Sequence, residues 1–96
     1  MEPGKIRIIN SGGQSENAFS QTIALAINNR LYRITNNGSI DGGPGVMTIS
    51  ISRSFFFFTI KSEFDLDVGR SVDVYGSTIK VLALTSLQLL GTYDTI

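Results

Sequence analysis

Four consecutive phenylalanines, Phe55, Phe56, Phe57 and Phe58, constrain the fold of this chain more than any other feature of its sequence. Successive side chains of a β-strand point to opposite faces, so four adjacent aromatic residues cannot all reach the core face of one half-buried strand. We therefore expect a strand that is covered on both faces. A second copy of the chain is the cover that we favour, because 96 residues scarcely fill three layers; burial within the chain and simple exposure remain alternatives.

The residues around this quartet alternate like strands, but the alternation changes phase. Met47, Ile49 and Ile51 are apolar at odd positions, whereas the apolar residues from Phe56 to Leu66 recur mainly at even positions. A change of phase requires an inserted residue, a turn or a crossing between sheets. The sequence therefore predicts a break at residues 52–54, followed by a strand that includes the quartet.

Short apolar runs between segments rich in Gly, Asn and Ser predict further strands. They are expected over residues 5–9, 21–27, 30–35, 71–75 and 78–84, and again around Leu87, Leu89 and Leu90. A helix is the alternative for residues 15–27, because Phe19, Ile23 and Ile27 also recur at helical spacing.

Turns and loops are expected where small and polar residues gather. Asparagine tolerates the positive φ of a tight hairpin, so Asn28 and Asn29 predict such a turn. Glycine predicts turns at residues 69–70 and 76–77. Residues 36–45 predict a flexible Gly-rich loop, and residues 91–96 an extended C-terminal arm.

These patterns predict one all-β domain over residues 1–96, built as a small antiparallel sandwich or partly open barrel of six to eight short strands. The chain has no Cys and no His, which removes disulfides and the usual ligands of zinc and transition metals. The acidic residues Glu63, Asp65 and Asp67 alternate with apolar ones and suit the solvent face of a strand. We therefore predict no metal and no cofactor.

Charge and hydropathy narrow the classes of function. The formal net charge is +0 and the pI is about 6.1, so no general field attracts polyanions, and a nucleic-acid partner is not the expectation. No signal peptide or membrane span is visible, so we expect a soluble chain whose compartment the sequence leaves open. No motif with the spacing of a catalytic site occurs, and we predict that the chain is not an enzyme.

The leading prediction is a non-enzymatic structural or protein-binding module that self-associates through its aromatic strand. Its interface is predicted to include Phe55, Phe57 and Ile9, together with the C-terminal arm. The alternative is a small RNA- or phosphate-binding β module, in which cations and an aromatic ring from different strands meet on one surface. The residues predicted for that patch are Arg30, Tyr32, Arg33 and Arg53.

Overall fold

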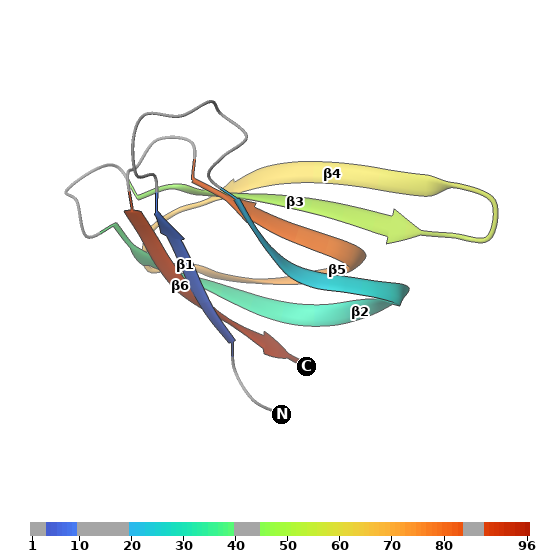
Figure 1. Cartoon of the computed structure of the whole chain (residues 1–96), viewed down its shortest axis with the longest axis horizontal. Helices are drawn as coiled ribbons and strands as arrows, with labels where there is room; N and C mark the ends of the chain where they lie inside the picture. Colours follow the sequence, from blue (N-terminus) through green and yellow to red (C-terminus); the bar gives the residue numbers. More distant parts are fainter. Residues whose placement is uncertain (1–3, 10–19, 40–44, 84–87) are drawn as a thin grey trace.

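The described part of the chain is one curled antiparallel sheet (Figure 1). The computed structural model describes residues 4–9, 20–39, 45–83 and 88–96. These residues form six strands: β1 (Gly4–Ile9), β2 (Ser20–Gly38), β3 (Met47–Ser54), β4 (Thr59–Leu66), β5 (Ser71–Leu82) and β6 (Gln88–Thr95). Their order in the sheet is β1-β6-β2-β5-β3-β4, and every pairing is antiparallel. The predicted all-β class and the predicted number of strands are confirmed.

The long strand β2 is what curls the sheet. Its first part pairs with the end of β5, and its second part pairs with the start of β5 and with β6. Register shifts after Thr22 and Leu25 bend the strand between these parts. Near the start of β2, before the bend, the side-chain amide of Gln21 donates to the Lys5 carbonyl and accepts from the Arg7 N–H, both at 2.9 Å. The curl therefore brings β1 beside the start of β2, as in a partly open barrel.

The concave side of the curl holds the core. Met47, Ile49 and Ile51 point into it from β3, as their alternation predicted. A single cluster contains the buried hydrophobic side chains of the described residues: Ile6, Ile8, Ile23, Ala24, Ile34, Met47, Ile49, Ile51, Leu66, Val74, Ile79, Val81, Ala83 and Leu89. All six strands thus contribute to one shared apolar interior, and only the tip of the β3–β4 hairpin extends beyond it.

Asn36 is a buried polar residue at the edge of this core, where β2 and β4 end and the chain enters β3. Its Nδ2 donates to the carbonyl oxygens of Gly45, at 2.7 Å, and Leu66, at 2.8 Å. Its Oδ1 accepts from the Gly38 N–H at 2.8 Å. One side chain therefore joins the end of β2, the segment before β3 and the end of β4, and its polar atoms are all paired.

Two predicted hairpin turns are wrong, because both positions lie inside long strands. Asn29 lies in the bend of β2, where its side-chain amide exchanges two hydrogen bonds of 3.0 Å with the backbone of Ser54. Gly76 lies in β5, and a Cβ there would meet Ile51 Cγ2 at 2.6 Å and the Ser52 carbonyl oxygen at 2.8 Å. The residues that resemble turn signals instead permit close contact between strands.

The predicted C-terminal arm is also wrong as a free element. Residues 91–95 belong to β6, which pairs with β1 on one side and β2 on the other. Residues 36–38 of the predicted flexible loop belong to β2, while residues 40–44 lie outside the described residues. For the segment with two competing periods, residues 20–27 are strand and residues 15–19 lie outside the described part.

Candidate functional site

The four phenylalanines form the turn of the β3–β4 hairpin, which we call the aromatic tip (Phe55 to Phe58). Strand β3 continues to Ser54 and β4 begins at Thr59, so the turn between them is four residues long. The chain therefore reverses later than the predicted break at 52–54. The Phe55 N–H donates to the Phe58 carbonyl at 2.8 Å and closes the turn. The prediction of a strand covered on both faces is therefore wrong, because strand alternation does not continue through a turn.

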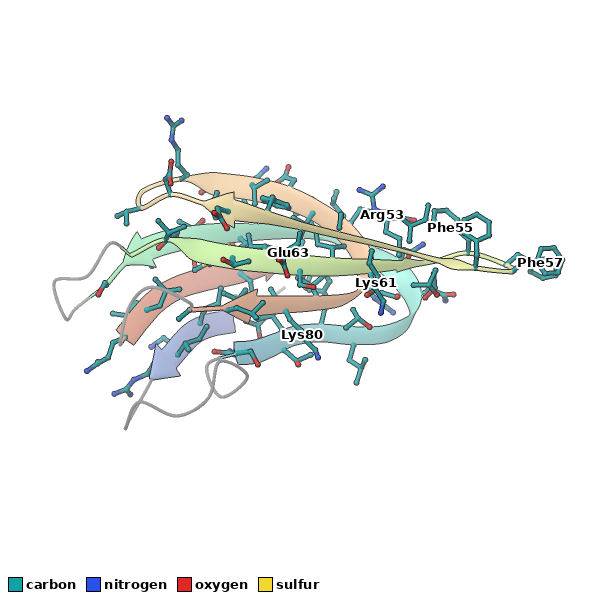
Figure 2. All side chains as sticks on the ribbon, turned by 90° about the horizontal axis from the view of Figure 1, so that it is seen from above. Arg53, Phe55, Phe57, Lys61, Glu63 and Lys80 are labelled. Carbon is teal, nitrogen blue, oxygen red and sulfur yellow. The ribbon has the colours of Figure 1, made fainter. Side chains whose placement is uncertain are left out.

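The aromatic tip is exposed at the end of a hairpin that reaches beyond the rest of the sheet (Figures 1 and 2). Phe56 and Phe57 are 90% and 86% exposed, and Phe55 and Phe58 are about half exposed. The rings pair with each other: Phe55 stacks on Phe58 with centroids 5.2 Å apart, and Phe56 meets Phe57 edge to face at 4.4 Å. Burial of the quartet within the chain, the second of the three alternatives, is therefore wrong.

The base of the hairpin is fastened to its neighbours by polar contacts. Arg53 Nε donates to the Tyr75 carbonyl at 2.9 Å, and its guanidinium carbon lies 5.9 Å from the centroid of the Tyr75 ring. Ser54 adds the two contacts with Asn29 described above and a 2.8 Å hydroxyl contact with Ser77. Because β2 and β5 both hold this base, the aromatic tip is presented on a supported arm.

The structure separates the residues that were predicted to form one interface. Phe55 and Phe57 lie at the aromatic tip, whereas Ile9 ends β1, the strand at the opposite edge of the sheet. The side chain of Ile9 lies outside the described part of the chain. Phe56, which alternation assigned to the core, is instead the most exposed of the four rings. The exposure of Phe56 follows from the turn, and that turn contains no asparagine or glycine by which the sequence could have revealed it.

The predicted basic patch is only partly assembled. Tyr32 is half-buried against the core, with its ring 6.4 Å from that of Tyr93. Arg33 donates from Nε to Asp73 Oδ1 at 2.8 Å and from Nη2 to Oδ2 at 3.3 Å. This hydrogen-bonded pair holds the pKa of Asp73 below its usual range and raises the pKa of Arg33.

The two remaining arginines of that patch come from β2 and β3, which lie on either side of β5. Arg30 is exposed and pairs across the strands with Gly76, the residue after Tyr75. Arg53 contacts Tyr75 directly. Tyr75, rather than Tyr32, is thus the exposed aromatic ring beside Arg53, whereas the register pairs Tyr75 with Leu31 and not with Arg30.

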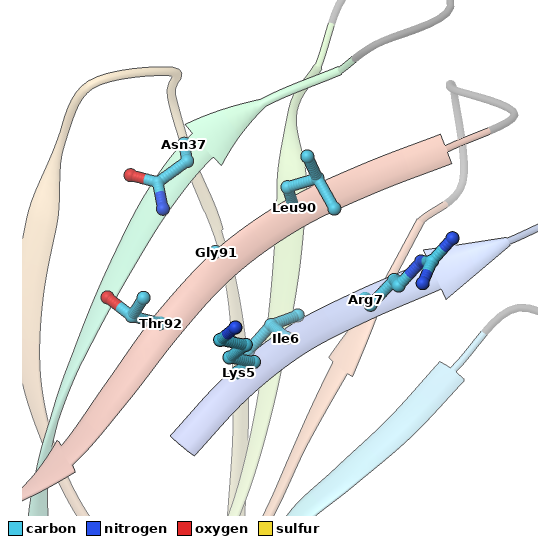
Figure 3. Close-up of a pocket in the computed structure, with 7 residues that line it drawn as sticks. All are labelled: Lys5, Ile6, Arg7, Asn37, Leu90, Gly91 and Thr92. Carbon is cyan, nitrogen blue, oxygen red and sulfur yellow. The ribbon is translucent and has the colours of Figure 1, made fainter. Parts of the chain in front are cut away.

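A shallow hollow of about 450 Å³ lies over β1 and β6 (Figure 3). Its lining residues are Lys5, Ile6, Arg7, Asn37, Leu90, Gly91 and Thr92. Its lining, as far as the structure describes it, contains two cations, Lys5 and Arg7, and no carboxylate. Among residues 4–9, 20–39, 45–83 and 88–96 no group of three His, Cys, Asp or Glu side chains is placed to hold a metal ion. The same residues contain no helix long and apolar enough to cross a membrane.

Comparison with known proteins gives no matching family model, no similar curated protein and no similar solved structure. The most distinctive feature of the chain is the aromatic tip, because large apolar side chains this exposed are unusual on a monomer.

Proposed function

We propose that this chain is a non-enzymatic structural or protein-binding module that self-associates through the aromatic tip. The observation that carries the proposal is the exposure of Phe56 and Phe57 at the end of a supported hairpin. At about 200 Å² for each phenylalanine, the four rings expose on the order of 550 Å² of apolar surface. A patch of that size is at the upper end for a monomer and often marks a binding surface.

The energetics favour a partner that covers the tip and also contacts its surroundings. Phe56 and Phe57 alone expose roughly 350 Å², and burying that area contributes roughly 9 kcal/mol. Association loses about 4–15 kcal/mol of translational and rotational freedom. The two quantities are of the same order, so the affinity depends on further contacts beside the tip. The sequence-predicted Phe55 and Phe57 stay in this interface, joined by Phe56 and Phe58, and Ile9 does not.

Sedimentation velocity over a range of protein concentrations tests the proposal. The wild-type chain is expected to associate as its concentration rises. The Phe56→Ser/Phe57→Ser variant is expected to remain a monomer, because replacing the two most exposed rings by serine side chains removes most of the apolar surface of the tip. Leu25→Ser is the matched control, since Leu25 is 79% exposed but belongs to β2 and not to the β3–β4 hairpin. A wild-type chain that stays monomeric at the highest soluble concentration, or equal effects of the two variants, would contradict the proposal.

The alternative function, binding of RNA or phosphate, retains support from one observation: the exposed guanidinium of Arg53 lies over the exposed ring of Tyr75. The pairing of Arg33 with Asp73 weakens it by engaging one of its cations. Its test is the anisotropy of labelled single-stranded RNA. Binding that falls steeply with salt and with Arg53→Ala supports it, and absence of binding at low salt removes it.

A further inference from the structure

Strand β4 is an unpaired sheet edge next to the aromatic tip. Among the described strands it pairs with β3 alone, and residues 59–63 are all exposed. The Phe55–Phe58 backbone hydrogen bond sets the alternation of the hairpin: Ile60, Ser62 and Phe64 turn their backbone groups toward β3. The residues between them turn their backbone N–H and C=O groups to the open edge. The other outer strand, β1, has its open edge bridged by Gln21.

The side chains of β4 are complementary to a second, reversed copy of the same strand. In an antiparallel pair centred on Ser62, Lys61 faces Glu63 of the second copy, and Glu63 faces its Lys61. On the other face of the strand, Ile60 meets the second copy's Phe64. Lys61 and Glu63 are exposed and make no ion pair within the described residues, so both are available (Figure 2). Charged side chains on an edge usually discourage pairing, but here their order favours one register.

Neighbouring registers are unfavourable for the same reason. Moving the centre by one residue toward the tip places Lys61 opposite Lys61 of the second copy. Moving it one residue the other way places Glu63 opposite Glu63. Like charges that face each other across strands are destabilising. The charge pattern therefore selects the register about Ser62.

We propose that two copies pair β4 with β4 about a two-fold axis at Ser62, so that the two sheets continue into one. This inference rests on the proposed self-association and names its geometry. The same register carries the aromatic tip of each copy alongside the β4–β5 turn of the other, where Val68 is 51% exposed. Edge pairing thus supplies the further contacts that the tip alone lacks, and the two together approach the roughly 800 Å² per partner of a standard interface.

Charge reversal tests the register in the full chain. Lys61→Glu alone, or Glu63→Lys alone, puts two like-charge pairs across the axis, and each is expected to weaken the dimer about tenfold at low salt. An equimolar mixture of these two variants is expected to regain the wild-type dissociation constant, because each acidic edge then faces a basic one. The double variant Lys61→Glu/Glu63→Lys is expected to dimerise like the wild type. A mixture no tighter than either variant alone would overturn the proposal.

Crosslinking tests the axis directly, because the chain has no cysteine of its own. Facing residues of such a pair lie about 4.5 Å apart at Cα, within the reach of a disulfide. Ser62→Cys is therefore expected to oxidise to a covalent dimer, and the control Thr59→Cys, which would face Asp65 of the second copy, is not. Equal crosslinking of the two variants would overturn the proposal.

The outcomes separate this inference from the one on which it rests. If Phe56→Ser/Phe57→Ser dissociates the wild-type assembly while the charge variants leave it unchanged, the tip associates by another geometry and the β4 register is wrong. If the wild type is monomeric throughout, the proposed self-association fails as well. Binding of that monomer to phosphatidylcholine–phosphatidylserine vesicles, lost with the tip variant, would assign the tip to a lipid surface instead and overturn both.

Discussion

Replacement of Asn36 is expected to destabilise the fold strongly, because its side chain joins the end of β2 to the end of β4. Asn36 is fully buried, and its amide pairs with the Gly45 and Leu66 carbonyls and the Gly38 N–H. Asn36→Leu conserves the volume but removes all three of these hydrogen bonds. At about 0.5–1.5 kcal/mol for each hydrogen bond lost, we expect a loss of about 2–4 kcal/mol in the free energy of unfolding. Small domains have about 5–15 kcal/mol in total, so the loss is large.

Asn36→Asp separates hydrogen bonding from volume through pH. The new carboxylate still accepts from Gly38, but it places a negative charge against the two carbonyl oxygens, and burial raises its folded-state pKa above the unfolded value. The destabilisation is therefore complete above the folded-state pKa and diminishes as the pH falls toward the unfolded one. Asn36→Leu has no such group, so its deficit relative to the wild type is expected to stay constant with pH.

Urea denaturation followed by far-UV circular dichroism at pH 7.5 and pH 4.5 measures both effects, with each variant compared to the wild type at the same pH. Asn37→Leu and Asn37→Asp are the matched controls, because Asn37 is the exposed neighbour on the same strand. The reasoning is refuted if Asn36→Leu lies within about 1 kcal/mol of the wild type, which is no more than one ordinary hydrogen bond contributes. It is refuted equally if the two Asn36 variants share one pH dependence.

Two further predictions concern the sheet itself. Gly76→Ala is expected to lower the free energy of unfolding by about 2–3 kcal/mol, because its Cβ would press on Ile51 and the Ser52 carbonyl. Gly69→Ala, where φ is +81° but no atom lies within 4 Å, is expected to lose only about 1 kcal/mol; equal losses in thermal unfolding would contradict the close approach at Gly76. Arg33→Ala is expected to return the lowered pKa of Asp73 toward its usual value, as measured by NMR titration of the carboxyl carbon. In the wild type this pair stabilises the fold at pH values above the unfolded-state pKa of Asp73, and the stabilisation is lost as the pH falls through the lowered folded-state pKa. An Asp73 titration that is unchanged in the Arg33→Ala variant would exclude the pairing.

The interface prediction shows how far a local pattern extends. Four adjacent phenylalanines do resist placement in one half-buried strand, and that argument correctly marked the segment as exceptional. The chain exposes them in a turn instead of continuing a strand, and a turn of four residues without glycine or asparagine resembles a strand in sequence. The change of phase between Met47 and Leu66 correctly indicates a break, but the predicted position at 52–54 is too early, since the chain reverses at residues 55–58.

Sequence alone determined the all-β class, the inward face of β3 and the strand character of β1, because alternation of apolar and polar residues is a local property of an extended chain. The tertiary structure alone decided which apparent turns are bends inside β2 and β5, since Asn29 and Gly76 are used by the distant residues Ser52 and Ser54. It also decided that the buried amide is Asn36, and that an aromatic tip and an open β4 edge lie side by side. Such placements depend on pairing between residues far apart in the chain, and no local pattern encodes which strands will meet.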